Sequence, residues 1–238
     1  MIVAIHQPHY FPWIGYFDKM AKSDAFVLLD EVQFEKGSQM IRNRVLDNNG
    51  EIKYITISAD TKDYLNRPYR DLLTKNINEW TKRQKNALNN YYRDATYYRE
   101  IFPIINEFLS KDYITVCEWT IGSINLISRL LNIDTPIINQ SEIKYDRAKK
   151  KSELVYSICN ALDADKYLSG RGASVDYLDR EKFLANGVQI VFQDVVCPVY
   201  KQCNTNQFVP GISIIDMLFN CGVFGTRELF WKVVHESR

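Results

Sequence analysis

Two short apolar runs with a helix-like segment between them constrain the fold of this chain most. Residues 2–5 (IVAI) and 25–29 (AFVLL) have the composition of buried strands, and GYFDKMAKSD between them predicts a helix of about two turns. So short a crossover fits two parallel strands of one sheet. Further strands are predicted at 136–139, 166–169 and 188–192, separated by helical segments such as 152–162, which Ser152 is expected to cap. We therefore expect an α/β fold with a mostly parallel, Rossmann-like sheet.

The middle of the chain has a different periodicity. Between residues 68 and 131 apolar residues recur at spacings of three and four, which predicts a mostly helical insertion. Ahead of it, NNG at 48–50 favours a tight turn, so residues 45–46 are predicted to form a hairpin with a strand at 53–59. The spacing of the apolar residues near the end of the chain predicts a last helix over 213–220. We expect all of these elements to form one α/β domain spanning residues 1–238.

The composition excludes several classes of protein. The 30 basic residues nearly cancel the 29 acidic ones, and the net charge of +1 gives no overall field that would attract nucleic acid or an anionic membrane. No apolar run approaches the roughly 18 residues that a membrane-spanning helix needs. The five cysteines are dispersed without a CxxC pair, and the first residues lack the features of a secretory signal. We therefore expect a soluble, cytoplasmic protein that acts on a small molecule.

The segment HQPHYFPWIGYF follows directly on the first predicted strand. Ligands of parallel α/β sheets bind outside the carboxyl ends of the strands, so this segment is predicted to line a binding crevice. His6, Gln7 and His9 can exchange protons or hydrogen bonds, and Asp30 follows the second strand at the same edge, so these four are the candidate catalytic residues. The candidate binding residues from the same two loops are Tyr10, Trp13, Gly15, Tyr16 and Gln33.

A purely structural reading of the same segment stays open. In that reading Phe11 and Trp13 are core residues, because large aromatic side chains contribute much of the buried area of a domain. His6 would then simply form a hydrogen bond with a backbone carbonyl group. The clustering of polar and aromatic residues favours the functional reading.

Two other clusters predict binding of phosphate. Arg42, Asn43 and Arg44 supply guanidinium groups, which bind phosphate through paired hydrogen bonds. Gly170, Arg171 and Gly172 follow a predicted strand, where a glycine turn exposes backbone N–H groups. Together they suggest a phosphorylated ligand such as a nucleotide or nucleotide sugar. No metal site is expected, because the chain has three histidines and no pair of them is spaced four residues apart.

Several long motifs make the chain resemble the WbqC-like protein family. They are HQP, PW and GYF after the first strand, RNR after the second, then YLSGRGA, FQD and PVY, and finally FVPGISIIDMLFNCG. On these motifs the resemblance adds four candidate binding residues, Tyr177, Gln202, Ser213 and Asp216. It implies a role in the synthesis of bacterial surface polysaccharide or O-antigen, where members of the family have a predicted role as glycine transferases.

The first strand and helix also resemble, more distantly, the start of the HxGH nucleotidylyltransferases. In those enzymes two histidines beside a glycine contact triphosphate at the start of a helix. Here Trp13 and Tyr16 stand at the histidine positions beside Gly15. This departure removes the imidazoles that would stabilise departing phosphates, but it is compatible with a nucleotide-binding crevice.

Three functions fit these residues. The first is transfer of a glycyl or related acyl group onto the amine of a nucleotide-linked amino sugar, with His6, His9 or Asp30 as general base. In that reaction Gln7 or backbone N–H groups would stabilise the oxyanion, and the basic clusters would hold phosphate. The second function is non-catalytic ligand binding or scaffolding in a glycan assembly pathway, and the third is nucleotidyl transfer. The cofactor stays open between ATP and a nucleotide-activated donor, and the sequence does not predict the oligomeric state.

Overall fold

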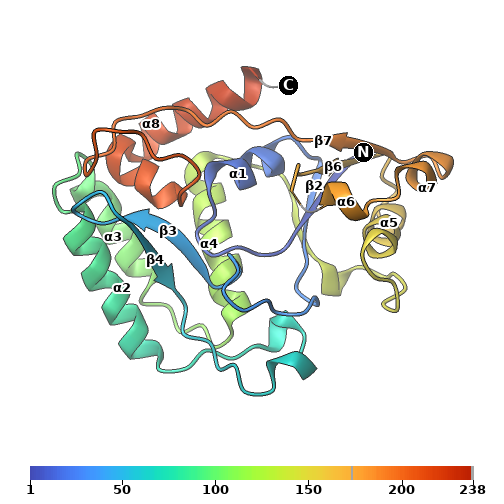
Figure 1. The fold of residues 1–238 in the computed structure, drawn as a ribbon, viewed down its shortest axis with the longest axis horizontal. Coiled ribbons are helices and arrows are strands. Elements are labelled where there is room, and N and C mark those ends of the chain that lie inside the picture. The colour runs from blue at the N-terminus through green and yellow to red at the C-terminus, as the bar shows by residue number, and fades with distance from the viewer. Residues whose placement is uncertain (173, 237–238) are drawn as a thin grey trace.

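The computed structural model describes residues 1–172 and 174–236, and its centre is a five-stranded parallel sheet (Figure 1). The strands lie in the order β5-β2-β1-β6-β7. Their bounds are β1 Ile2–His6, β2 Ala25–Leu28, β5 Ile137–Asn139, β6 Lys166–Ser169 and β7 Gln189–Phe192. The predicted parallel α/β fold is therefore confirmed.

The strand order creates a switch point between β1 and β6. From β1 the chain continues outward to β2 and β5 on one side, and then returns past β1 to build β6 and β7 on the other. Because β1 and β6 are parallel neighbours, the segments that follow them leave the sheet at the same edge but in opposite directions. Such a switch point opens the crevice in which open α/β sheets bind their ligands.

Alternate residues of the strands pack into two separate cores. Ala4 and Phe26 face a core that includes α1 (Ile14–Ala21), α4 (Val116–Leu131) and α8 (Ile214–Glu236). Val3 and Val27 face a second core with α5 (Ser152–Ala161) and α7 (Arg180–Ala185). A short helix, α6 (Ser174–Tyr177), follows β6. The two-residue period of a strand thus divides one apolar run between the two faces of the sheet.

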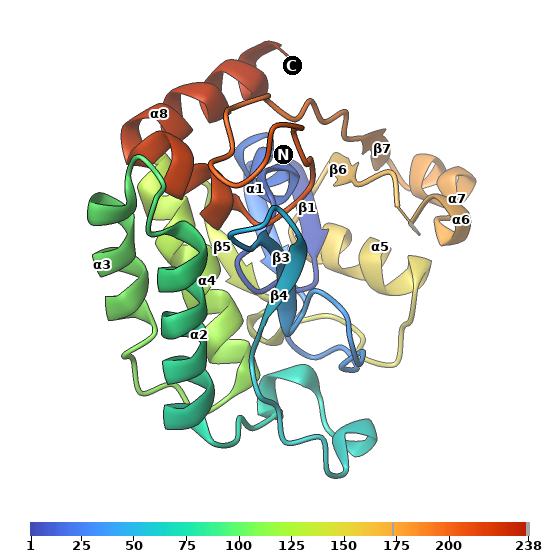
Figure 2. The ribbon, with the colours of Figure 1, turned by 60° about the vertical axis from the view of Figure 1, so that its left-hand side comes forward.

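The segment between β4 and β5 is mostly helical. It consists of α2 (Ile77–Tyr92), α3 (Tyr98–Phe108) and α4, with short 3₁₀ helices at Tyr64–Asn66 and Tyr69–Asp71 ahead of them. Trp80 and Trp119 are buried and meet edge to face with ring centroids 4.8 Å apart, which joins α2 to α4. Figure 2 shows the helices of this block side by side on the side of the molecule away from α5 and α7.

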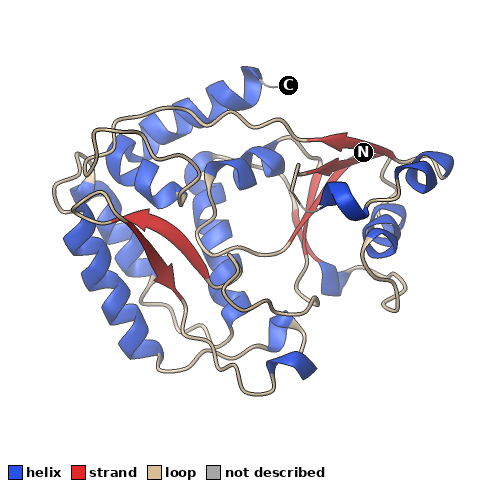
Figure 3. Cartoon of the chain, viewed as in Figure 1, coloured by secondary structure: helices blue, strands red, loops and turns tan. Residues whose placement is uncertain are grey.

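The predicted hairpin forms a small sheet of its own. Strands β3 (Arg42–Leu46) and β4 (Ile52–Thr56) pair antiparallel around the turn at Gly50, and they lie apart from the parallel sheet (Figure 3). The second strand ends three residues earlier than expected from the sequence. Beyond it, Ala59 pairs with Thr74 in an isolated bridge, so the chain has already turned towards α2.

Two predicted helix boundaries are wrong. Ser152 is the first residue of α5 and not its cap, because Lys151 occupies the cap position and the Ser152 hydroxyl accepts a hydrogen bond from the backbone N–H of Asp179. The last helix continues far beyond residue 220, with a break at Gly222, whose φ of 70° is not helical. None of the described helices, α8 included, is long and apolar enough to cross a membrane.

Candidate functional site

A pocket of about 390 Å³ lies at the carboxyl ends of β1, β6 and β7, at the switch point of the sheet. Its residues come from the end of β1, from the start of α1 and from the segments after β6 and β7: His6, Trp13, Gly15, Tyr16, Lys19, Gly170, Arg171, Gly172, Gln193, Asp194 and Val195. A larger groove lies between α2 and α3, but no residue from a strand end lines it. The position at the switch point therefore identifies the smaller pocket as the candidate site.

The loop between β1 and α1 is held in place by hydrogen bonds to four distant segments. The backbone N–H of Phe11 donates to the hydroxyl of Ser123 on α4 (3.0 Å), and its carbonyl accepts from Asn43 on β3 (2.8 Å) and from Ser213 (2.8 Å). The hydroxyl of Tyr10 donates to the amide oxygen of Gln84 on α2 (2.9 Å). Phe11 has a φ of 41°, a left-handed conformation that is costly for a side chain of this size. These hydrogen bonds hold that conformation and so present His6 and Trp13 to the pocket.

His6 lines the pocket as a neutral imidazole. Its Nδ1–H donates to the carbonyl of Gln7 (3.0 Å), which leaves the lone pair on Nε2. Burial, and after it the neighbouring His9 and Lys19, lower the pKa of His6 well below its ordinary value. The backbone hydrogen bond expected in the structural reading is therefore present, and it coexists with a place in the pocket wall.

His9 and Tyr16 pack against His6, and Tyr16 also lines the pocket. The ring centroid of His6 lies 4.5 Å from that of His9 and 4.7 Å from that of Tyr16. Burial lowers the pKa of His9 to about 3, and its buried Nδ1 has no hydrogen-bond partner in the described part of the chain. The Tyr16 hydroxyl donates to the carbonyl of Gln7 (3.2 Å), and burial raises its pKa well above 10. These two side chains contact the imidazole of His6, and the Tyr16 hydroxyl shares with it the Gln7 carbonyl.

Lys19 lines the pocket but was not predicted from the sequence, and the same holds for Gln193, Asp194 and Val195. Its side chain is 3% exposed, and its Nζ donates to the carbonyl of Ile5 (2.8 Å), with no carboxylate within 4.0 Å among the described residues. Burial lowers its pKa from 10.5 to about 7. Lys19 stands four residues after Gly15 in α1, so helical spacing alone would have placed the two on one face. Because a lysine with this pKa is only partly protonated near pH 7, a negatively charged ligand in the pocket would favour its cationic form.

The segments after β6 and β7 complete the pocket. Arg171 donates from Nε to the carbonyl of Gln193 (3.2 Å), which joins the two segments. The side-chain amide of Gln193 donates to the carbonyl of Gly15 (2.8 Å) and to the carboxylate of Asp18 (2.6 Å), which fastens the pocket to α1. Asp194 supplies the one carboxylate in the lining, against the two cations Lys19 and Arg171. The pocket thus has an excess of positive charge.

The ring of Trp13 leaves no room for a side chain at position 15. A Cβ atom on Gly15 would lie 2.4 Å from the indole ring of Trp13, which therefore packs directly against the glycine backbone at the start of α1. The ring forms one wall of the pocket and stands in the space that any other residue at position 15 would fill. A glycine here is required by the neighbouring tryptophan, whatever the pocket binds.

The candidate residues at the end of β2 take part in other contacts. The carboxylate of Asp30 accepts from the backbone N–H (2.9 Å) and hydroxyl (2.6 Å) of Ser141, which begins the segment after β5. Gln33 donates to the carbonyl of Tyr64 (3.2 Å). Neither residue lines the pocket, and neither does Gln7, Tyr10 or His9. The structure therefore brings together His6, Trp13, Gly15 and Tyr16 from the opening segment and leaves its other candidates outside.

The RNR cluster contacts backbone and aromatic groups outside the pocket. Arg42 donates to the carbonyl of Gly37 (2.8 Å) and lies over the ring of Tyr54. Arg44 donates to the carbonyl of Gly211 (2.7 Å), and Asn43 holds the opening loop. None of the three residues lines the pocket, so their predicted role in binding phosphate has no support from its lining.

Asp216 is the centre of a buried network between α2 and α8. Its carboxylate accepts from the hydroxyls of Tyr92 (2.9 Å) and Tyr200 (2.7 Å) and from the amide of Gln202 (3.0 Å). Because burial outweighs these hydrogen bonds, the pKa of Asp216 is raised. Ser213 contacts the opening loop through Phe11, so the opening and closing motifs do meet, but none of these residues lines the pocket. Tyr177 on α6 is also outside it, 40% exposed.

Comparison with known proteins gives two matches. The model of the WbqC-like protein family matches residues 7–228, which include the opening loop and most of α8. The chain is 30% identical over 222 residues to the uncharacterized protein Rv1507c of Mycobacterium tuberculosis, and the alignment covers 92% of this chain and 94% of that protein. No solved structure matches the chain.

Proposed function

This chain belongs to the WbqC-like protein family, and we propose that it transfers a glycyl or related acyl group onto the amine of a nucleotide-linked amino sugar. The observation that carries the proposal is that two basic side chains and one neutral imidazole lie together in the pocket at the strand ends. Lys19 and Arg171 are cations without a carboxylate within 4.0 Å in the described part of the chain, and His6 beside them is neutral. The basic side chains suit a phosphorylated ligand, and the neutral imidazole of His6 suits removal of a proton.

The cations support binding of the diphosphate of a nucleotide sugar. A buried ammonium group without a carboxylate partner is costly, and a bound anion would offset that cost. The pocket also borders the first turn of α1, where the helix dipole favours negative charge. Trp13 offers an aromatic ring on which a sugar or base can stack.

The imidazole of His6 would act as the base in the transfer step. The neutral amine of the acceptor attacks the carbonyl carbon of an activated acyl donor, a thioester or acyl phosphate. The new C–N bond forms, the bond from that carbon to sulfur or oxygen breaks, and the proton of the amine passes to Nε2 of His6. The hydrogen bond from Nδ1 to Gln7 keeps that lone pair on Nε2. The assignment to surface polysaccharide synthesis rests on the family resemblance.

Binding tests the first half of the proposal. We expect UDP-glucosamine and UDP-glucose to raise the melting temperature, because both carry the diphosphate, and free glucosamine to leave it unchanged. The shift should disappear in Lys19→Met and Arg171→Ala, and persist in Lys232→Met, a control at an exposed position of α8. Absence of a shift with both UDP sugars, or a shift that survives both pocket variants, would contradict the proposal.

Turnover tests the second half. With UDP-glucosamine and a glycyl thioester, we expect a product heavier by one glycyl group, detected by mass spectrometry. His6→Asn should lower the rate by about 100-fold or more while it keeps the melting-temperature shift, and His235→Asn, near the end of α8, should leave both unchanged. Binding without any product would favour the scaffolding alternative, whereas pyrophosphate release from a triphosphate would favour nucleotidyl transfer.

A further inference from the structure

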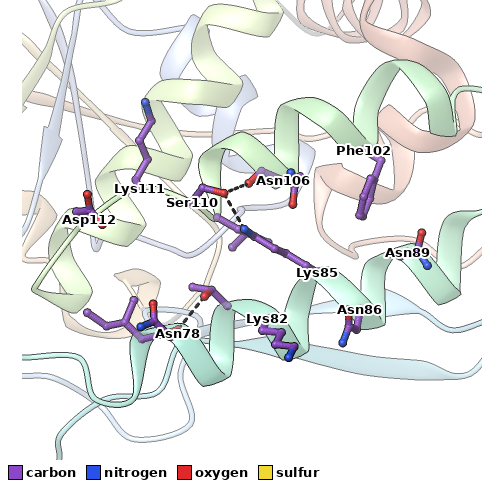
Figure 4. Close-up of a pocket in the computed structure, with 13 residues that line it drawn as sticks. Asn78, Lys82, Lys85, Asn86, Asn89, Phe102, Asn106, Ser110, Lys111 and Asp112 are labelled. Carbon is purple, nitrogen blue, oxygen red and sulfur yellow. Dashed lines mark hydrogen bonds between the residues drawn. The ribbon is translucent and has the colours of Figure 1, made fainter.

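The groove between α2 and α3 is a second hollow, with a volume of about 620 Å³ (Figure 4). It belongs to the helical block and shares no residue with the pocket at the strand ends. The facing sides of two packed helices are ordinarily apolar. Here most of the lining is polar: Asn78, Thr81, Lys82, Lys85, Asn86, Asn89, Asn106, Ser110, Lys111 and Asp112, against Ile77, Phe102 and Leu109. Most of these polar side chains are exposed, among them Asn78, Lys82 and Asn86, so they are accessible to a ligand at the surface.

Several polar groups of the groove are available to a ligand. The side chains of Asn78, Asn86 and Asn106 form no hydrogen bond with the described residues. Asn89 accepts from the hydroxyl of Tyr98 through its amide oxygen (2.5 Å), which orients the side chain and leaves its NH₂ group to donate. An amide both donates and accepts, as a sugar hydroxyl does, so a row of amides matches a ligand rich in hydroxyl groups.

The charges of the groove favour an anion. The lining includes three lysines, Lys82, Lys85 and Lys111, and one carboxylate, that of Asp112. Among the described residues only Lys111 of the three has a carboxylate within 4.0 Å, that of Glu107. Lys85 extends from α2 to the hydroxyl of Ser110 beyond the end of α3 (2.7 Å), as Figure 4 shows. Two lysines therefore contribute positive charge without a compensating carboxylate among the described residues.

One aromatic ring lies in the same groove. Phe102 on α3 is half-buried and stacks on Tyr98, with ring centroids 5.0 Å apart. Its remaining surface offers an apolar face to a sugar ring. A single ring and no guanidinium group are a poor match to nucleic acid, whose binding sites combine successive aromatic rings with a positively charged track along the backbone.

We propose that this groove binds an acidic oligosaccharide, a short chain of sugars that carry carboxylate groups. The amides contact the hydroxyls, the lysines contact the carboxylates, and Phe102 contacts one sugar ring. The groove and the pocket at the strand ends are separate and take different probes, so either proposal can fail without the other.

Titration of the full chain with trigalacturonic acid, followed by calorimetry at low ionic strength, tests the proposal. We expect measurable binding that weakens with added salt, and weaker binding of neutral maltotriose, a sugar of the same length. The double variant Lys82→Ala/Lys85→Ala should weaken trigalacturonate binding by about tenfold. Asn86→Ala should weaken both sugars, because it removes an amide that no other residue uses.

Two controls keep the test decisive. Lys232→Ala removes an exposed helical lysine elsewhere, on α8, and should bind trigalacturonate as the unaltered protein does. A single-stranded oligouridylate serves as the nucleic-acid probe. The proposal is wrong if trigalacturonate does not bind, if Lys232→Ala weakens it as much as the double variant, or if the oligouridylate binds more tightly.

Discussion

At the scale of single residues, Lys19 is the most informative side chain in the molecule. It is 3% exposed, and its Nζ donates a hydrogen bond to the carbonyl of Ile5. Its pKa falls to about 7, so its charge changes near neutral pH. Because His6 stays neutral over the same range, Lys19 is the cation whose protonation decides how strongly the pocket attracts an anion.

The titration of Lys19 predicts a change of stability with pH. A lysine whose pKa is lowered in the fold binds fewer protons there than in the unfolded chain between pH 7 and 10.5, so its contribution to stability increases as pH rises through that window. Relative to Lys19→Met, the unaltered protein should gain about 2 kcal/mol in the free energy of unfolding between about pH 7 and about pH 9. Urea unfolding of both proteins measures this gain, and Lys232→Met controls for the substitution. A constant difference between the two proteins would contradict the prediction.

At the scale of elements, α8 contains two glycines with opposite structural requirements. Gly222 has a φ of 70°, and a Cβ atom there would lie 2.5 Å from the ring of Tyr97. Gly225, one turn later, has its nearest neighbour at 3.5 Å from such an atom, the Cβ of Cys221. The first glycine permits the break in α8 that lets Tyr97 approach it, whereas the second only lowers the helix propensity.

Alanine at the two positions should therefore have opposite effects on stability. Gly222→Ala combines backbone strain with a steric clash and should lower the free energy of unfolding by about 2 kcal/mol or more. Gly225→Ala fits an ordinary helical position and should raise it by about 0.5 kcal/mol. Thermal unfolding of the two variants side by side checks both signs. Equal effects at the two positions would show that the break at Gly222 is not needed.

At the scale of the whole molecule, the buried carboxylate of Asp216 joins parts of the chain that are far apart in sequence. It binds Tyr92 of α2 and the segment before α8 through Tyr200 and Gln202. The same closing segment contacts the opening loop through Ser213 and β3 through Arg44. These contacts connect the helical block, the hairpin and the loop that presents His6.

Loss of the Asp216 carboxylate should lower the free energy of unfolding of the whole protein. Asp216→Ala leaves the buried hydroxyl of Tyr92, the part-buried hydroxyl of Tyr200 and one amide without their acceptor, so we expect a loss of about 3 kcal/mol in the free energy of unfolding. Tyr200→Phe removes one donor and should cost about 1 kcal/mol. Asp134→Ala, at an exposed position, should cost almost nothing. Urea unfolding measures all three, and a small effect of Asp216→Ala would mean that water replaces the network.

The sequence by itself determined the parallel sheet and predicted a crevice at the edge where the pocket lies. Local apolar runs and their spacing predict strands, helices and the parallel crossover, because each pattern is complete within a few residues. The lining of the pocket includes His6, which ends β1, then Trp13, Gly15 and Tyr16 from the loop and helix after β1, and residues 170–172 after β6. Their catalytic and binding roles stay predictions.

Only the tertiary structure decided which partner each polar side chain meets. Asp30 binds Ser141, and Arg44 binds the carbonyl of Gly211, over separations of 111 and 167 residues. The sequence does not show that the candidates Asp30, Arg44 and Asp216 have protein partners, or that no carboxylate of the described residues lies within 4.0 Å of the Lys19 ammonium group. Periodicity reports the local geometry of the backbone, whereas burial and hydrogen bonding between distant segments are set by how the elements pack.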